Sequence, residues 1–133
     1  MKRKPSLSSL KRKKLPSLAK LKRRLDILFS QWIRRRDCAP NGDTGYCISC
    51  GTWAVLQAGH FIKRQHLALR FDERNVNGQC VRCNHFLHGN DAEYCLALIK
   101  RYGHSVVGEL MRLKRTTVHM TREDYNTLIE RYS

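Results

Sequence analysis

Two Cys-x-x-Cys pairs constrain this 133-residue chain more than any other feature of its sequence. A redox-active dithiol is the competing interpretation of one such pair, but two pairs in one chain favour a metal site. Four thiolates complete the tetrahedral shell of a Zn²⁺ ion and leave no position open for a substrate. We therefore expect the metal to be structural. The predicted ligands are Cys47, Cys50, Cys80 and Cys83.

The spacing of these pairs also favours a fold class. The stretch between them, residues 51–79, is long enough to hold structure of its own. Two cysteine knuckles that enclose a hairpin and precede a helix are typical of a treble-clef arrangement. Apolar residues recur at three- and four-residue steps over residues 18–36, which predicts an N-terminal helix. We expect one small α+β domain over residues 17–133, with a zinc-bound core at about 45–90 and C-terminal helices at 90–132.

Shorter patterns predict the elements within this domain. The segment at residues 52–61 has the pattern of a β-hairpin or short strands, and a loop through residues 63–74 follows it. A short helix is expected from about Asn84. Three further helices are expected, over residues 89–103, 105–114 and 121–132. Two of these begin with capping-box patterns, Asn90 with Glu93 and Thr121 with Asp124.

Positive charge is concentrated near the N-terminus. Lysine and arginine number 26 against 11 acidic residues, and residues 1–24 hold 11 of those cations and no acid. Such a segment attracts phosphate backbones because binding releases condensed counterions. We expect residues 1–16 to form a disordered arm that binds nucleic acid; a solvated tail and an anionic membrane surface are the alternatives. The predicted contacts here are Lys11, Arg12, Lys13, Lys14, Arg23 and Arg24.

The apolar content of the chain argues against a membrane location. No stretch approaches the roughly 20 apolar residues of a membrane span, and the N-terminus lacks the apolar core of a secretory signal. We therefore expect a cytoplasmic protein. In that reducing compartment the six cysteines are expected to be metal ligands or free thiols rather than disulfides.

A second group of polar residues surrounds the cysteine pairs. His60 ends a predicted strand, Asn75 precedes the second pair, and Asn84 directly follows it. His88 lies one helical turn beyond Asn84, so these two side chains are expected to share a face. Each residue alone has a structural explanation, as a strand-end histidine, a turn asparagine or a helix cap. Their joint spacing favours a catalytic site.

The order His, Asn, Asn around two Cys-x-x-Cys pairs resembles the HNH nucleases of the ββα-metal superfamily. The closer resemblance is to the NinG or Rap family of phage recombination endonucleases, to which the recombinase-dependent phage nucleases are similar. The segments that carry it, all between residues 29 and 90, are "FSQWIRRRD", "CISCG", "QAGHF", "LRFDERNVNGQCVRCN" and "HGN". The basic arm and the C-terminal helices lie outside it. The resemblance implies a ββα-metal core and a phage-encoded protein in the bacterial cytoplasm.

The resemblance also implies roles for individual residues in phosphodiester hydrolysis. His60 matches the general base, a role that suits imidazole because it can take a proton from water near neutral pH. Asn75 matches the residue that orients the imidazole through a hydrogen bond. Asn84 matches a ligand of the catalytic divalent metal. The products implied carry a 5′-phosphate and a 3′-hydroxyl.

One position departs from the HNH pattern. These enzymes usually carry Asp or His, a metal ligand, immediately before the base, and this chain has Gly59 there. Asp72 and His88 are the candidates to complete the metal shell, and His88 matches a ligand of the colicin branch. A carboxylate would favour Mg²⁺, whereas Asn with His would favour Mn²⁺ or a later transition metal.

The sequence therefore predicts a metal-dependent DNA endonuclease. By resemblance, its substrates would be branched or displaced-strand recombination intermediates such as a Holliday junction. A host recombinase and a second copy of the chain, giving a homodimer, are candidate partners. The alternatives are a non-catalytic treble-clef protein that binds nucleic acid and an accessory recombination factor. Four arginines around the site are predicted phosphate contacts, although a solvated face would explain them nearly as well: Arg64, Arg70, Arg74 and Arg82.

Overall fold

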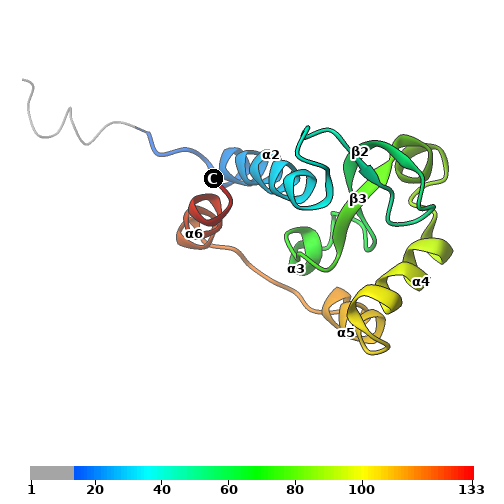
Figure 1. The fold of residues 1–133 in the computed structure, drawn as a ribbon. Helices are drawn as coiled ribbons and strands as arrows, with labels where there is room; N and C mark the ends of the chain where they lie inside the picture. The colour runs from blue at the N-terminus through cyan, green and yellow to red at the C-terminus, as the bar shows by residue number, and fades with distance from the viewer. Residues whose placement is uncertain (1–13) are drawn as a thin grey trace, which may run out of the picture.

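An antiparallel sheet with the strand order β1-β2-β3 forms the centre of the computed structural model, which describes residues 14–133 (Figure 1). β1 (Thr44–Tyr46) pairs with the first half of β2 (Trp53–His60). β3 (Val76–Cys80) pairs with the second half of β2, and His60 lies opposite Val76. The long strand β2 therefore connects the cysteine-bearing end of the sheet to the end that carries His60.

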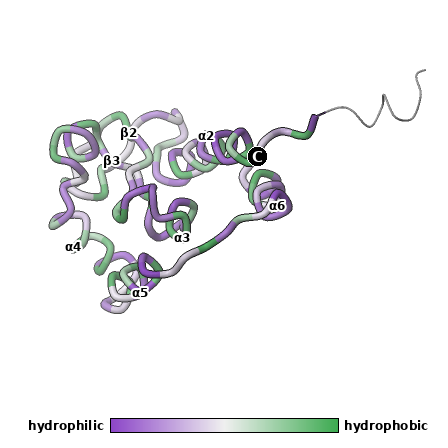
Figure 2. Tube along the Cα trace, turned by 180° about the vertical axis from the view of Figure 1, so that it is seen from behind, coloured by the Kyte–Doolittle hydropathy of each residue, from purple (hydrophilic) through white to green (hydrophobic). Residues whose placement is uncertain are grey.

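Two helices from opposite ends of the chain pack together beside the sheet. α2 (Leu18–Asp37) and α6 (Arg122–Tyr132) lie next to each other in Figure 1. α2 begins after Ser17, whose hydroxyl accepts a hydrogen bond from the backbone N–H of Lys20. Figure 2 shows hydrophobic and hydrophilic residues alternating along α2, as expected for a half-buried helix. The apolar stripe of α2 packs into one core with residues of β3 and α6, and its buried members are Leu21, Leu25, Phe29 and Ile33.

A second apolar core lies between α3 (Leu67–Arg70), α4 (Asp91–Tyr102) and α5 (Val106–Lys114). Tyr94 of α4 is fully buried there, and its hydroxyl donates a 2.7 Å hydrogen bond to the carbonyl of Gly59. This bond joins α4 to the end of β2, next to His60. Beyond α5 the chain runs as an extended segment to α6 (Figure 1).

A largely buried polar network fixes the end of α2 to β3. Asp37, the last residue of the helix, accepts hydrogen bonds from the backbone N–H of Gly78 at 2.8 Å and from Arg36 at 2.8 and 2.9 Å. Arg36 also donates to the backbone carbonyls of Glu73 and Val76. Burial alone would raise the pKa of Asp37, but these hydrogen bonds outweigh it and lower the pKa. The network thereby places α2 across the sheet.

The mixed α+β class is confirmed, and so are several of the predicted elements. The helices expected over residues 18–36, 105–114 and 121–132 are α2, α5 and α6, each within one residue of the predicted ends. The capping box of Thr121 and Asp124 forms at the start of α6. No helix in the part of the chain that the structure describes is long and apolar enough to cross a membrane.

Other local predictions are wrong in detail. Of the two forms expected for residues 52–61, a strand is present and a hairpin is not: they supply one strand, β2, whose partners lie on either side in the sequence. The expected loop at residues 63–74 contains the short helix α3. The short helix expected from Asn84 begins earlier, as the π-helix η1 (Arg82–Phe86). Asn90 occupies the predicted N-cap position directly before α4, but the expected capping box does not form: its backbone is left-handed, with φ 47°, and its side chain makes no capping bond.

Candidate metal centre and catalytic cavity

The four predicted cysteine ligands meet at one end of the sheet. Their Sγ atoms lie within 4.8 Å of one another, and among residues 14–133 no other group of three or more His, Cys, Asp or Glu side chains meets in this way. The sulfurs of Cys50 and Cys80 are 3.7 Å apart. An all-sulfur set of four ligands suits Zn²⁺, so the cluster fits the predicted metal site. Cys38 and Cys95 are not part of it.

N–H groups near the cluster point at its sulfurs. The backbone N–H of Cys83 donates to Cys80 Sγ at 3.4 Å, and the side-chain amide of Asn90 donates to Cys83 Sγ at 3.5 Å. The side chain of Thr52 lowers the pKa of Cys50 to about 6, whereas burial raises the pKa of Cys83 to about 12. Four thiolates this close repel one another. A bound dication would remove that repulsion, and its binding would then be coupled to folding.

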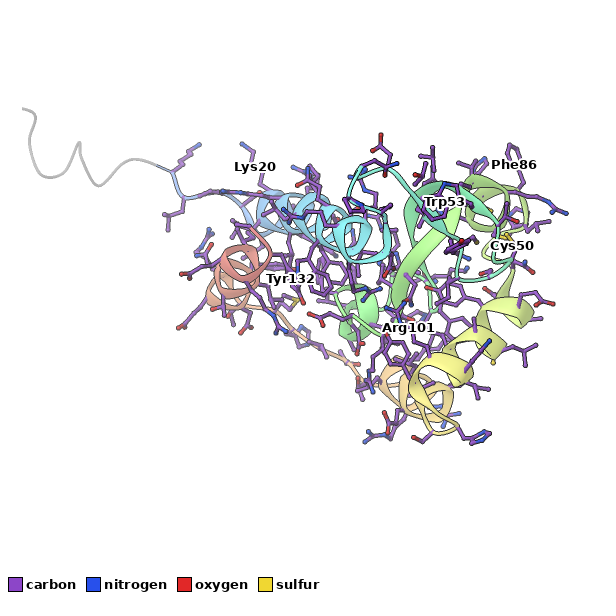
Figure 3. All side chains as sticks on the ribbon, in the orientation of Figure 1. Lys20, Cys50, Trp53, Phe86, Arg101 and Tyr132 are labelled. Carbon is purple, nitrogen blue, oxygen red and sulfur yellow. The ribbon has the colours of Figure 1, made fainter. Side chains whose placement is uncertain are left out.

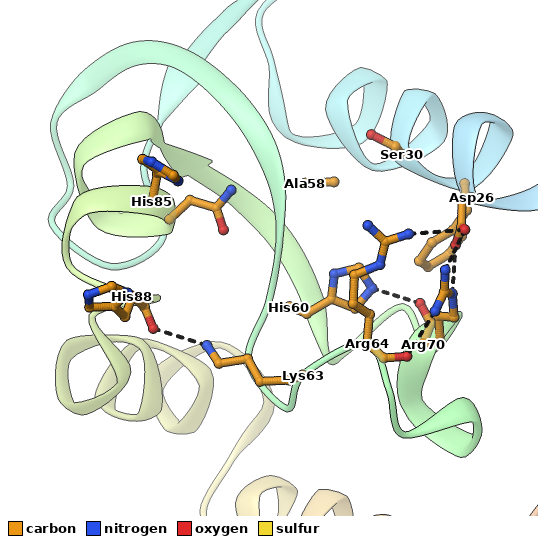
Figure 4. Close-up of a pocket in the computed structure, with 11 residues that line it drawn as sticks. Asp26, Ser30, Ala58, His60, Lys63, Arg64, Arg70, His85 and His88 are labelled. Atoms are coloured by element: carbon orange, nitrogen blue, oxygen red, sulfur yellow. Dashed lines mark hydrogen bonds and ion pairs between the residues drawn. The ribbon is translucent and has the colours of Figure 1, made fainter. Parts of the chain in front are cut away.

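A cavity of about 450 Å³ lies between α2, the end of β2 and η1. It brings together three residues predicted from the sequence, His60, Asn84 and His88. Figure 4 shows His60 and His88 on opposite sides of it. His88 was expected one helical turn beyond Asn84 on the same helix. That reason is wrong, because η1 ends before His88, which lies in a left-handed turn with φ 52°. An unusual backbone angle at a non-glycine residue in a cavity is typical of functional sites.

The charged residues in the lining of this cavity are mostly cationic. Lys63, Arg64 and Arg70 contribute three positive charges, and Asp26 is the one carboxylate among the lining residues. Lys63 donates to the carbonyl of His88 at 3.1 Å, which joins the two sides of the cavity. A concave surface with an excess of positive charge attracts an anionic ligand such as a phosphodiester.

The imidazole of His60 is held by the backbone. Its Nε2 lies 2.9 Å from the carbonyl oxygen of Arg70 (Figure 4). A carbonyl only accepts, so Nε2 carries the proton and the lone pair of Nδ1 stays free to accept one. Burial lowers the pKa of His60, and the charges of Arg64 and Arg70 lower it further, against the opposing effects of the Arg70 carbonyl and Asp26. The ring is therefore a neutral acceptor at neutral pH.

Asp26 is a residue of this site that the sequence did not single out. Its carboxylate accepts hydrogen bonds from Arg70 at 2.8 and 2.5 Å and from Arg64 at 3.1 Å. It thus connects α2 to the segment whose carbonyl holds His60. One signal was present: Asp26 is the first acidic residue of the chain, after 25 residues without one.

Two predicted residues have other partners than those expected. Asn75 is fully buried, but its side chain does not hold the imidazole; it accepts from the N–H of Ile62 at 2.8 Å and donates to the carbonyls of Ile62 and Leu69. Asn75 therefore shapes the loop around His60 rather than the ring itself. Asp72 does not line the cavity, and its carboxylate accepts from the backbone and guanidinium of Arg74. That leaves His88 as the candidate beside Asn84.

Gly59 departs from the HNH pattern for a steric reason. It is buried, and a Cβ at this position would overlap the side-chain carbonyl of Gln79. Successive side chains of a strand point to opposite faces, so position 59 also faces away from His60. An acid directly before the base has no room in this fold.

The predicted phosphate contacts fall into different surroundings. Arg64 and Arg70 line the cavity, whereas Arg74 is paired with Asp72 and with Glu109 at 2.6 Å. Four others are exposed without lining it: Lys14, Arg23, Arg24 and Arg82. The remaining three, Lys11, Arg12 and Lys13, lie outside the residues that the structure describes.

Comparison with known proteins identifies the family. Over 90 residues, 61% of this chain, the sequence is 46% identical to Protein ninG of Escherichia phage 933W and covers 45% of that protein. It is 46% identical to Protein ninG of Salmonella phage P22 and 45% identical to that of Escherichia phage lambda, covering 44% of each. The match thus spans less than half the length of these relatives. No solved structure matches the chain. Residues 2–133 match the family model described as Bacteriophage Lambda NinG protein, so the predicted resemblance to this family is confirmed and the chain belongs to it.

Proposed function

We propose that this protein is a metal-dependent DNA endonuclease of the HNH type that acts on branched or displaced-strand recombination intermediates. The observation that carries the proposal is the hydrogen bond from His60 Nε2 to the Arg70 carbonyl, which leaves Nδ1 free beside a cationic cavity. The order of β2, β3 and η1 fits the strand, strand and helix of a ββα-metal core. The preference for branched DNA comes from the resemblance stated above.

In this proposal His60 is the general base. Its Nδ1 takes a proton from a water molecule, and the resulting hydroxide forms a bond to phosphorus while the bond from phosphorus to the 3′ oxygen breaks. The products carry a 5′-phosphate and, after protonation of the leaving oxygen, a 3′-hydroxyl. Lys63 and Arg64 are the exposed cations of the cavity and would bind the phosphate oxygens. Arg64 donates one hydrogen bond to Asp26, whereas Arg70 donates to both carboxylate oxygens and is the more firmly held.

The residues that would hold a catalytic metal are Asn84 and His88. The Asn84 side-chain N–H₂ donates to Gln57 at 2.8 Å, which leaves its carbonyl oxygen available as a ligand. When bound there, a divalent cation would stabilise negative charge on the phosphate and the leaving oxygen. One amide oxygen and one imidazole nitrogen, with no free carboxylate in the lining, favour Mn²⁺ over Mg²⁺.

Purified protein should be tested on labelled linear, single-stranded and branched DNA with Mg²⁺, with Mn²⁺ and with neither. We expect metal-dependent cleavage that is fastest with Mn²⁺ on branched DNA. His60→Ala should lose cleavage but keep DNA binding and bound zinc. Cleavage by that variant at the wild-type rate would refute the role of His60. The oligomeric state on a symmetric junction, measured in the same samples, tests the homodimer.

The second candidate is a non-catalytic zinc protein that binds nucleic acid. The absence of a free carboxylate among the residues that line the cavity favours it. This alternative predicts binding without cleavage in every metal. A parallel series with a host recombinase added separates it from an accessory factor, which would support cleavage only when the recombinase is present.

A further inference from the structure

Phe86 is an exposed aromatic side chain beside the cavity. It is the last residue of η1 and is 69% exposed, and Figure 3 shows it at the outer end of the molecule. It belongs to none of the three buried apolar clusters. A single exposed hydrophobic residue is ordinary on a protein surface. What distinguishes Phe86 from other exposed hydrophobic residues is its position next to the cavity.

The ring of Phe86 does not line the cavity itself but contacts a ring that does. It contacts His85 edge to face, with ring centroids 5.1 Å apart, and His85 lines the cavity together with Asn84 and His88. A nucleobase is joined to its phosphate through a single sugar. A phosphate bound by the cations of the cavity therefore brings its own base, or the adjacent one, to the rim where Phe86 lies.

We propose that Phe86 stacks on an unpaired nucleobase when a DNA strand occupies the cavity, so that this site selects DNA with unpaired bases over fully paired duplex. This rests on the proposed function, since it takes the cavity as the phosphodiester site. Charge complementarity identifies the occupant: an aromatic face next to a cationic lining matches a ligand that has both a π-face and a phosphate. In an intact duplex each base covers the faces of its neighbours, and only an unpaired base offers a free face.

A binding experiment with a fluorescent base tests this inference. A duplex with a short single-stranded branch carries 2-aminopurine in the branch, and the matched control is a fully paired duplex. The protein is zinc-loaded, and no Mg²⁺ or Mn²⁺ is added, so no cleavage is needed. Stacking quenches 2-aminopurine. We expect wild-type protein to quench the branch base, Phe86→Ala to lose the quenching, and Phe86→Tyr to keep it.

The affinities provide the second readout. Phe86→Ala should bind the branched DNA about five-fold or more weakly, with little change on the paired duplex, because stacking contributes to binding one base at a time. Tyr46→Ala is the control: Tyr46 is also a 69% exposed aromatic residue, but it pairs with Trp53 at the opposite end of β2 from His60, whereas Phe86 contacts His85 of the cavity lining. It should leave quenching and affinity unchanged. Zinc content and thermal melting confirm that each variant is folded.

The outcomes separate this inference from the nuclease proposal. Equal loss of affinity for branched and paired DNA in Phe86→Ala would show a general or intercalating contact and would overturn selection of unpaired bases. Unchanged quenching in that variant would overturn the stacking itself. Absence of cleavage by wild-type protein in the earlier assay, with Phe86-dependent quenching intact, would remove the catalytic proposal and leave this one standing.

Discussion

The imidazole of His60 and the backbone carbonyl of Arg70 form a 2.9 Å hydrogen bond that determines which ring nitrogen is free. The side chain of Arg70 is held in turn by Asp26, which lies in α2. The N-terminal helix thus braces the candidate base through one ion pair and one carbonyl. This arrangement gives α2 a role in positioning as well as in packing.

Asp26→Asn should slow cleavage without weakening DNA binding. The amide preserves the shape of the carboxylate but loses the charge that holds Arg70, so the carbonyl that orients His60 becomes mobile. We expect kcat to fall by about 10- to 100-fold, with KM nearly unchanged. The control is Asp91→Asn, which removes an exposed carboxylate 3.5 Å from Lys63 and should have little effect. An equal decrease in kcat in both variants, or a change in KM alone, would argue against a positioning role for Asp26.

The pH dependence of cleavage should report a histidine with a lowered pKa. Burial lowers the pKa of His60 below its ordinary value of about 6.5, so the ring loses its proton before neutral pH is reached. The rate should rise with pH, with the midpoint of the rise below about pH 6.5, and should then reach a plateau. The lowered pKa also affects stability. Because His60 binds the proton more tightly in the unfolded state, the folded state loses stability as the pH falls below about 6.5.

A profile of log kcat between pH 5 and 9 measures this. Asp26→Asn should move the rising limb to lower pH, because the carboxylate favours the protonated ring and its loss lowers the pKa of His60 further. A midpoint above pH 6.5 in wild-type protein would contradict the assignment of His60 as a partly buried base.

Removing the cysteine-bound metal should unfold the core rather than only stop catalysis. The cluster joins the knuckle before β2 to the end of β3 and the start of η1. Four thiolates at these distances would repel one another without a cation between them. We expect one Zn²⁺ per chain and loss of near-UV circular dichroism on chelation. Cys80→Ser should bind no zinc stably and should melt at a lower temperature. Cys38→Ser, which lies outside the cluster, should keep both properties, and full zinc in Cys80→Ser would show that the site is elsewhere.

Local patterns in the sequence account for much of this fold. The apolar period of α2 and the spacing of the two cysteine pairs each depend on neighbours in the chain, and both were predicted with the correct residues. The meeting of His60, Asn84 and His88 came from a family resemblance, and the cavity brings these three together. The residue types at these three positions would not, by themselves, have indicated that they share a site.

The remaining features depend on contacts between distant segments. Asp26 meets Arg70 across 44 positions, a pairing that requires α2 to be placed on the sheet first. Asp72 was a candidate metal ligand by residue type, but a neighbour only two positions away, Arg74, takes up its carboxylate. The close approach of Gly59 to Gln79 is likewise visible only after β2 and β3 have paired.

Replacing Arg23 and Arg24 with glutamine should reduce the salt dependence of DNA binding. Both are exposed on α2, which also contributes Asp26 and Ser30 to the cavity, so a strand in the cavity would continue along this helix. Each lost phosphate contact changes the slope of log K against log salt by about 0.9, so we expect the slope to become shallower by about 1.8.

The matched control changes the same amount of charge at arginines that are already paired. Arg74 lies between Asp72 and Glu109, and Arg131 pairs with Glu73 at 3.2 Å. Replacing these two with glutamine should leave the slope close to that of wild-type protein, because each already has an acidic partner. Fluorescence anisotropy with a labelled duplex over 50–300 mM salt, about the range in which such slopes are measured, compares the two variants. If both pairs lowered the slope equally, net charge and not the α2 surface would account for binding.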